Sequence, residues 1–218
     1  MSQDPILGVA FEKGDVRGFL HMPAGGSQFG LVITHGAGSN CQAPLLIAVA
    51  SAFCAEGAGV LRCDLPFRQK RLKGPPSPAM AAADRAGLRS AVQALRALGP
   101  GRTYLGGHSY GGRQASMLAA EETKVADALL LLSYPLHPPR KPDQLRSAHF
   151  PKIHAPVVFV HGTTDPFGTL DEMEAAVRMI EAQTKLLPIE GAGHDLKHGR
   201  FNLRALVSAL HDVGNQAV

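Results

Sequence analysis

The chain is poor in the residues that build disulfide, metal and nucleic-acid sites. Its 218 residues include no tryptophan, three tyrosines and three cysteines. Cys41, Cys54 and Cys63 are odd in number and lack metal-ligand spacing, so we expect free thiols in a reducing compartment. No metal site is expected. No apolar run is long enough to span a membrane, so no membrane association is expected.

Charged residues are also scarce, at 18% of the chain with a net charge of +4. They are scattered except for one cluster, Arg68, Lys70, Arg71 and Lys73. Because aromatic platforms are few, we expect no nucleic-acid partner and interpret the cluster by default as a solvated basic loop. The N-terminal residues lack a basic region followed by an apolar stretch, which favours a cytoplasmic location.

The hydrophobic content of 45% fits one globular domain spanning residues 1–218. Apolar runs and helical stripes alternate along the chain. The predicted strands are 7–12, 16–22, 30–34, 58–63, 102–107, 127–133, 156–161 and 184–189, and the predicted helices are 42–56, 79–98, 111–121, 169–182 and 201–213. This alternation predicts an α/β fold, with a mostly parallel central sheet flanked by helices.

The segment between Ser133 and Pro156 is short and rich in proline. Proline fixes the backbone without building a helical cap. We therefore expect no cap domain, and a shallow active site that is open to solvent.

The most informative motif is Gly107-His108-Ser109-Tyr110-Gly111, between a predicted strand and a predicted helix. In a nucleophile elbow of this kind the turn is tight, the serine backbone is strained, and the two glycines relieve the crowding. The motif predicts Ser109 as a nucleophile. Alone, it is also compatible with an ordinary glycine-rich turn.

Two further residues complete a catalytic set. Asp165 follows the predicted strand 156–161, and His194 follows the predicted strand 184–189. Because the carboxyl ends of parallel strands share one edge of a sheet, we expect Asp165 and His194 to meet Ser109 there.

The segment His35-Gly36-Ala37-Gly38-Ser39 follows another predicted strand. It predicts an oxyanion loop in which Ala37, with Gly38 as the rival, supplies one N–H group and Tyr110 the other. Six residues are expected to contact the substrate: His35, Gly36, Gly38, Arg68, Tyr134 and His137. For His137 the alternative is a loop histidine with no such role. No cofactor is needed.

These motifs resemble the alpha/beta-hydrolase superfamily, whose members carry the triad in the chain order Ser, Asp, His. The small uncapped body is similar to dienelactone-hydrolase-like enzymes, although these have a cysteine where this chain has Ser109. The segments 35–39, 134–139 and 162–168 resemble most closely a hydrolase-like group. That group is named for a testis-expressed protein and for a subunit of the non-specific-lethal histone-acetyltransferase complex.

The expected function is that of a serine hydrolase acting on a small carboxylic ester or thioester. The alternatives are a peptidase or C–C hydrolase of the same fold, and a non-catalytic binding or scaffold protein. The basic clusters 68–73 and 140–141 favour anionic acyl groups if both flank the site, and are otherwise solvated loops. The acyl and alcohol groups and the oligomeric state are left open.

Overall fold

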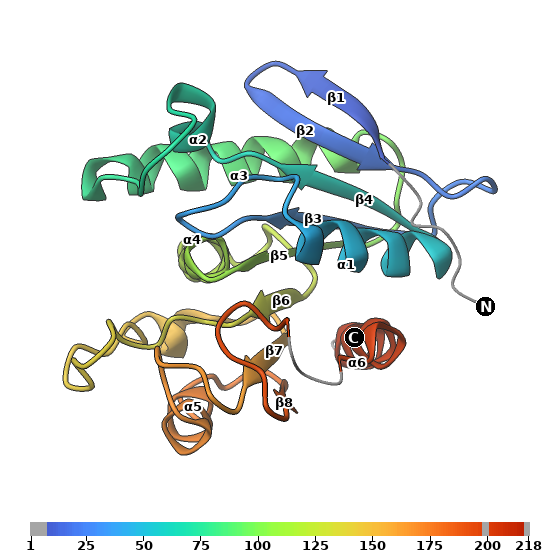
Figure 1. Cartoon of the computed structure of the whole chain (residues 1–218). Helices are drawn as coiled ribbons and strands as arrows, with labels where there is room; N and C mark the ends of the chain where they lie inside the picture. Colours follow the sequence, from blue (N-terminus) through green and yellow to red (C-terminus); the bar gives the residue numbers. More distant parts are fainter. Residues whose placement is uncertain (1–7, 198–200, 216–218) are drawn as a thin grey trace.

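The computed structural model describes residues 8–197 and 201–215, so residue 7 of the predicted strand 7–12 lies outside the described residues. One sheet runs through the molecule in the order β1-β2-β4-β3-β5-β6-β7-β8 (Figure 1). The strands are β1 (Val9–Lys13), β2 (Val16–His21), β3 (Phe29–Thr34), β4 (Ala58–Cys63), β5 (Thr103–His108), β6 (Leu129–Leu132), β7 (Val157–Gly162) and β8 (Thr184–Ile189). The hairpin β1–β2 is antiparallel and joins β4 antiparallel, whereas the pairs from β4 to β8 are parallel.

Helices cover both faces of this sheet. They are α1 (Pro44–Ala55), α2 (Pro66–Lys70), α3 (Ala81–Arg96), α4 (Tyr110–Glu121), α5 (Leu170–Val177) and α6 (Leu203–Asn215), with 3-10 turns η1 (Pro78–Met80) and η2 (Phe150–Lys152). One core layer lies between the sheet and α3, α4 and α5. The other lies between the sheet and α1 and α6, which contact each other (Figure 1). This arrangement confirms the predicted α/β fold.

The inner strands are buried and largely apolar because both of their faces are covered. All residues of β3, β4, β6 and β7 are buried. Runs of this kind are typical of parallel strands, which lie inside the sheet. Because these strands are parallel, the loops that follow β3, β5, β7 and β8 all emerge at the carboxyl edge of the sheet.

The structure differs from the sequence prediction at two helices. The helix α2 lies in the segment predicted as a loop, because five residues are too few to show a helical period. The predicted helix 169–182 ends at Val177, although Ile180 still packs into the core through a following turn.

The connection between β6 and β7 holds no cap domain; its regular structure is the turn η2. Across the described ranges 8–197 and 201–215, none of the helices has both the length and the apolar character of a membrane span.

Candidate active site

Ser109 lies at the turn from β5 into α4, with φ 51° and ψ −116°. A residue with a side chain rarely adopts a positive φ, and the neighbouring glycines make the turn possible. A Cβ at Gly107 would lie 2.6 Å from the carbonyl carbon of Gly111, and a Cβ at Gly111 would lie 2.6 Å from the carbonyl oxygen of His35. The Ser109 N–H donates to the Leu132 carbonyl at 2.8 Å, which anchors the turn to β6.

A continuous hydrogen-bonded chain joins Ser109, His194 and Asp165. The Oγ of Ser109 lies 2.8 Å from Nε2 of His194, and Nδ1 of His194 lies 2.7 Å from Oδ2 of Asp165. Because a carboxylate only accepts, Nδ1 donates to Asp165, and the neutral ring keeps a lone pair on Nε2 toward the serine. The structure thus brings together the three residues that the sequence placed on three separate loops.

Three contacts hold this chain in place. The Phe167 ring packs on the His194 ring with their centroids 4.2 Å apart, and the Phe167 N–H donates to Oδ1 of Asp165 at 2.9 Å. The Nε2 of His108 donates to the His194 carbonyl at 2.8 Å. Sequence reasoning missed Phe167, whose one signal is its place two residues after Asp165.

Two backbone segments beside Ser109 carry the N–H groups that are predicted to face a substrate carbonyl. Tyr110 is the first residue of α4, so its N–H has no partner inside the helix. The loop 35–39 lies against the elbow, since a Cβ at Gly36 would be 3.4 Å from Cβ of Ser109. Ala37 and Gly38 on this loop are the two candidates for the second donor.

The Tyr110 side chain is fixed by a residue that the sequence did not suggest. Its hydroxyl donates to Asp84 at 2.7 Å, and the other oxygen of Asp84 accepts from the Phe67 N–H at 3.0 Å. Burial raises the pKa of the Asp84 carboxyl. Asp84 thus ties α3 to the elbow and to α2.

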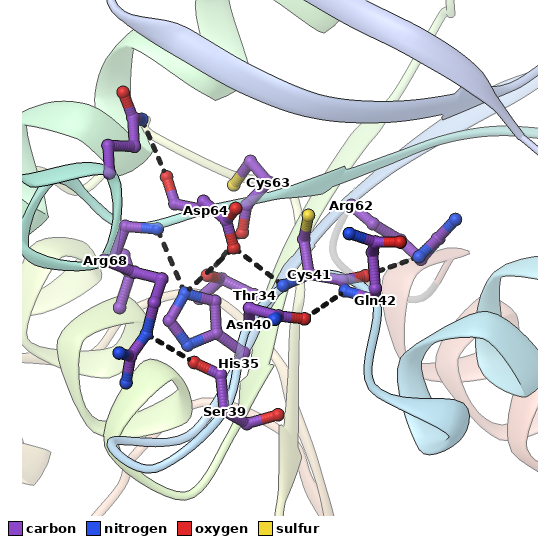
Figure 2. A network of polar contacts seen from close by, with 12 residues as sticks. Thr34, His35, Ser39, Asn40, Cys41, Gln42, Arg62, Cys63, Asp64 and Arg68 are labelled. Carbon is purple, nitrogen blue, oxygen red and sulfur yellow. Dashed lines mark hydrogen bonds and ion pairs between the residues drawn. The ribbon is translucent and has the colours of Figure 1, made fainter. Parts of the chain in front are cut away.

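Arg68 does not belong to a solvated loop, which corrects that prediction. It lies on α2 and is 4% exposed. Its guanidinium donates to the carbonyls of Ser39 (2.7 Å) and Ala37 (2.8 Å) and to those of Arg71 and Gly74 (both 3.1 Å). Figure 2 shows the contact with Ser39. Because these bonds occupy four of its five N–H donors, Arg68 acts as a support for the oxyanion loop.

His35 supports the same loop from behind. It is fully buried, its Nδ1 donates to the Gly36 carbonyl at 2.9 Å, and its Nε2 accepts from the Leu65 N–H at 3.2 Å. Burial lowers the pKa of His35, which keeps the ring neutral as these two bonds require. Asp64 continues the network by accepting from the Cys41 N–H at 2.7 Å (Figure 2).

The structure does not bring Tyr134 to the site. Tyr134 has no exposed surface, and its hydroxyl donates to the Arg146 carbonyl at 2.6 Å, so its predicted contact with substrate is wrong. His137 is 6% exposed, with Nδ1 on the Pro138 carbonyl and Nε2 at 3.4 Å from the Glu172 carboxylate. Both residues brace the loop after β6.

Within the part of the chain that the structure describes, no three His, Cys, Asp or Glu side chains form a group able to hold a metal ion.

Comparison with known proteins now identifies the family. Residues 27–216 match the family profile described as "Alpha/beta hydrolase domain". This chain belongs to the alpha/beta hydrolases.

Solved alpha/beta-hydrolase structures share the fold over nearly the whole chain. Dienelactone hydrolase from Anabaena variabilis is 20% identical, with a TM-score of 0.72 over 96% of each chain. Est1E from Butyrivibrio proteoclasticus is 18% identical, with a TM-score of 0.73 over 97% of this chain and 98% of its own. A monoacylglycerol lipase from Paleococcus ferrophilus is 15% identical, with a TM-score of 0.69 over 93% and 99%. The closer resemblance to the testis-expressed group stays a prediction.

Proposed function

We propose that this alpha/beta hydrolase is a serine hydrolase that cleaves a small carboxylic ester or thioester through an acyl-enzyme. The observation that carries the proposal is the chain of hydrogen bonds from Ser109 through His194 to Asp165, which begins at a serine in a strained turn. A strained backbone of this kind costs about 1–3 kcal/mol of stability, and such residues cluster at active sites.

In the proposed mechanism, Oγ of Ser109 attacks the substrate carbonyl carbon as its proton passes to Nε2 of His194. The N–H groups of Tyr110 and Ala37 or Gly38 stabilise the oxyanion of the tetrahedral intermediate. The bond to the alcohol or thiol then breaks, and the leaving group takes the proton from His194. Water, deprotonated by His194, attacks the acyl-enzyme and releases the acid and free Ser109. Asp165 orients the imidazole and stabilises its charged form throughout.

Structural neighbours support small esters as the substrate class. Est1E has been solved with ferulic acid bound, and DcsB with a substrate analogue. Both chains share this fold at TM-scores of 0.73. A small carbonyl substrate also suits a site without a cap.

Hydrolysis of a panel of small esters and thioesters by Ser109→Ala tests the proposal. The variant should lose about 10⁴- to 10⁶-fold in kcat, because members of a triad act as a unit. The control is Ser116→Ala, on the same helix, whose hydroxyl donates to the Arg113 carbonyl at 2.9 Å. Turnover near the wild-type rate in Ser109→Ala would exclude serine catalysis, and a wild-type chain inactive on the whole panel would favour the scaffold alternative.

A further inference from the structure

An apolar cavity of about 450 Å³ lies beside the elbow. It is lined by the N-terminal part of α1, by residues 195–197 and by the start of α6, and the two helices lie side by side in Figure 1. Its walls include Gly36, Pro44, Leu45, His108, Leu196 and Phe201. A volume of this size is typical of sites for small organic molecules.

The cavity adjoins the reacting atoms. Gly36 belongs to its wall, and a Cβ at Gly36 would lie 3.1 Å from Nδ1 of His108 and 3.4 Å from Cβ of Ser109. Asp195 and Leu196, which directly follow His194, also line it. A group bound in the cavity is therefore within reach of a carbonyl held at Ser109.

The cavity offers no buried charge to a ligand. Its two charged lining residues, Asp195 and Lys197, pair with each other at 3.1 Å, and their side chains are 51% and 69% exposed at the rim. The wall contains two histidines, His35 and His108, and burial lowers the pKa of both, which keeps the rings neutral. The Nε2 of His108 donates to the His194 carbonyl.

The buried cation behind the oxyanion loop is also engaged. Arg68 donates to four backbone carbonyls, two of them on the oxyanion loop. A carboxylate entering the cavity would lose its water and find no partner, which is strongly unfavourable. An alkyl chain or an aromatic ring would instead bury apolar surface against Leu45, Leu196 and Phe201.

We propose that this cavity binds an uncharged apolar group of the ester, an alkyl chain of several carbons or an aromatic ring, and so selects neutral hydrophobic substrates over anionic ones. The inference rests on the proposed hydrolase function. The preference for a neutral group that it assigns is the opposite of the preference for anionic acyl groups suggested by the basic clusters 68–73 and 140–141.

Two arms of one assay locate the apolar group on the acyl or the alcohol side. The first compares 4-nitrophenyl acetate with 4-nitrophenyl hexanoate, and the second compares methyl acetate with hexyl acetate. In one of the two arms kcat/KM should rise at least ~10-fold with chain length, because each buried methylene favours binding. Equal kcat/KM values in both arms would overturn the inference.

The charge preference is measured with a matched pair. Mono-4-nitrophenyl adipate has the six-carbon acyl chain of the hexanoate with a carboxylate in place of its terminal methyl group. If the acyl group enters the cavity, the hexanoate should be favoured at least ~30-fold. If the alcohol group enters it, hexyl acetate should be favoured by a similar factor over the acetate ester of 6-hydroxyhexanoate. A preference for the anionic ester would contradict the proposal.

Ala48→Leu fills the cavity from α1, where Ala48 is half-buried in its wall. Leucine is a strong helix former, so α1 should be retained. The ratio of kcat/KM for the long to the short ester should fall toward one. The matched control, Ala55→Leu, changes an exposed alanine on the same helix outside the cavity and should keep the wild-type ratio.

A second variant, Leu45→Lys, places a cation in the wall and should shift the preference toward the anionic ester by at least ~10-fold. Unchanged selectivity in both Ala48→Leu and Leu45→Lys would overturn the inference.

Labelling with a small fluorophosphonate distinguishes failure of the cavity proposal from failure of the hydrolase function on which it rests. Labelled wild-type protein without chain-length or charge preference refutes the cavity proposal alone. Protein that is neither labelled nor active on any of the esters refutes the hydrolase function and the cavity proposal with it.

Discussion

Among single residues, Ser109 is the most constrained. Its φ of 51° is held by hydrogen bonds to the Leu132 carbonyl and from the Arg113 N–H, and by the close approach of Gly107 to Gly111. The backbone around Ser109 therefore positions its hydroxyl beside His194.

This strain predicts a difference in stability between two inactive variants. The free energy of unfolding should be about 1 kcal/mol larger for Ser109→Gly than for Ser109→Ala, because glycine adopts this backbone conformation without strain. Urea unfolding of the two proteins measures the difference. Equal stabilities would mean that the turn is not strained by the side chain at this position.

The half-buried His149, outside the triad, predicts a pH effect on stability. Burial, with the nearby charges of Arg113 and Arg85, lowers the pKa of His149 from 6.5 to about 4. Below pH 6.5 the unfolded chain therefore binds a proton that the folded chain does not, so stability falls as the pH falls from 6.5 to 4.

The expected loss over this window is about 2 kcal/mol, the shift being discounted because the ring is partly exposed. His149→Gln should remove this part of the pH dependence. Thermal or urea unfolding of both proteins at pH 7, 5.5 and 4 checks it. Parallel stability curves for the wild type and the variant would contradict the assignment to His149.

Among the elements, α2 and the oxyanion loop form one unit through Arg68. Arg68→Lys keeps the charge but loses the fork that reaches four carbonyls, so the loop should lose its fixed position. We expect kcat to fall about 10-fold with KM nearly unchanged, because the loop acts mainly on the transition state.

The matched control is Arg71→Lys, in the same segment. Arg71 is exposed, and its side chain donates to the Pro75 carbonyl. A loss carried by KM alone in Arg68→Lys, or an equal loss in both variants, would argue against a positioning role for Arg68.

The elements that the sequence predicted best are those with a strong period. All eight strands match within two residues where they are described, because buried parallel strands are continuous apolar runs bounded by turns. The short helix α2 was missed because Pro66–Lys70 reads locally as the start of a charged loop. Its burial depends on carbonyls of the oxyanion loop about 30 residues earlier, which local periodicity does not report.

In the site, too, the residues that belong to local motifs were predictable from the sequence, whereas those that act through tertiary contacts were not. Ser109, Asp165 and His194 were predictable because each follows a strand in a recognisable loop, and parallel strands bring those loops to one edge. The supporting roles of Asp84, Phe167 and Arg68 arise from contacts between distant segments. The apolar cavity likewise combines α1 with the chain after His194, and no local pattern contains it.

For the molecule as a whole, the missing cap predicts the kinetics on aggregated substrates. The connection from β6 to β7 is short and braced by Tyr134, so it offers no lid that a lipid surface could open. The rate on a short-chain ester should therefore follow ordinary saturation through the critical micelle concentration. A sharp increase in rate at that concentration would show that some element moves on contact with an interface.

The most direct test of the central claim is the identity of the residue that a fluorophosphonate modifies. Peptide mass spectrometry of the labelled wild-type chain should find the phosphonyl group on Ser109 alone, since only a serine paired with His194 is activated. Labelling should be lost in Ser109→Ala and kept in Ser116→Ala. An adduct on another serine, or an unmodified Ser109 in folded protein, would contradict Ser109 as the nucleophile.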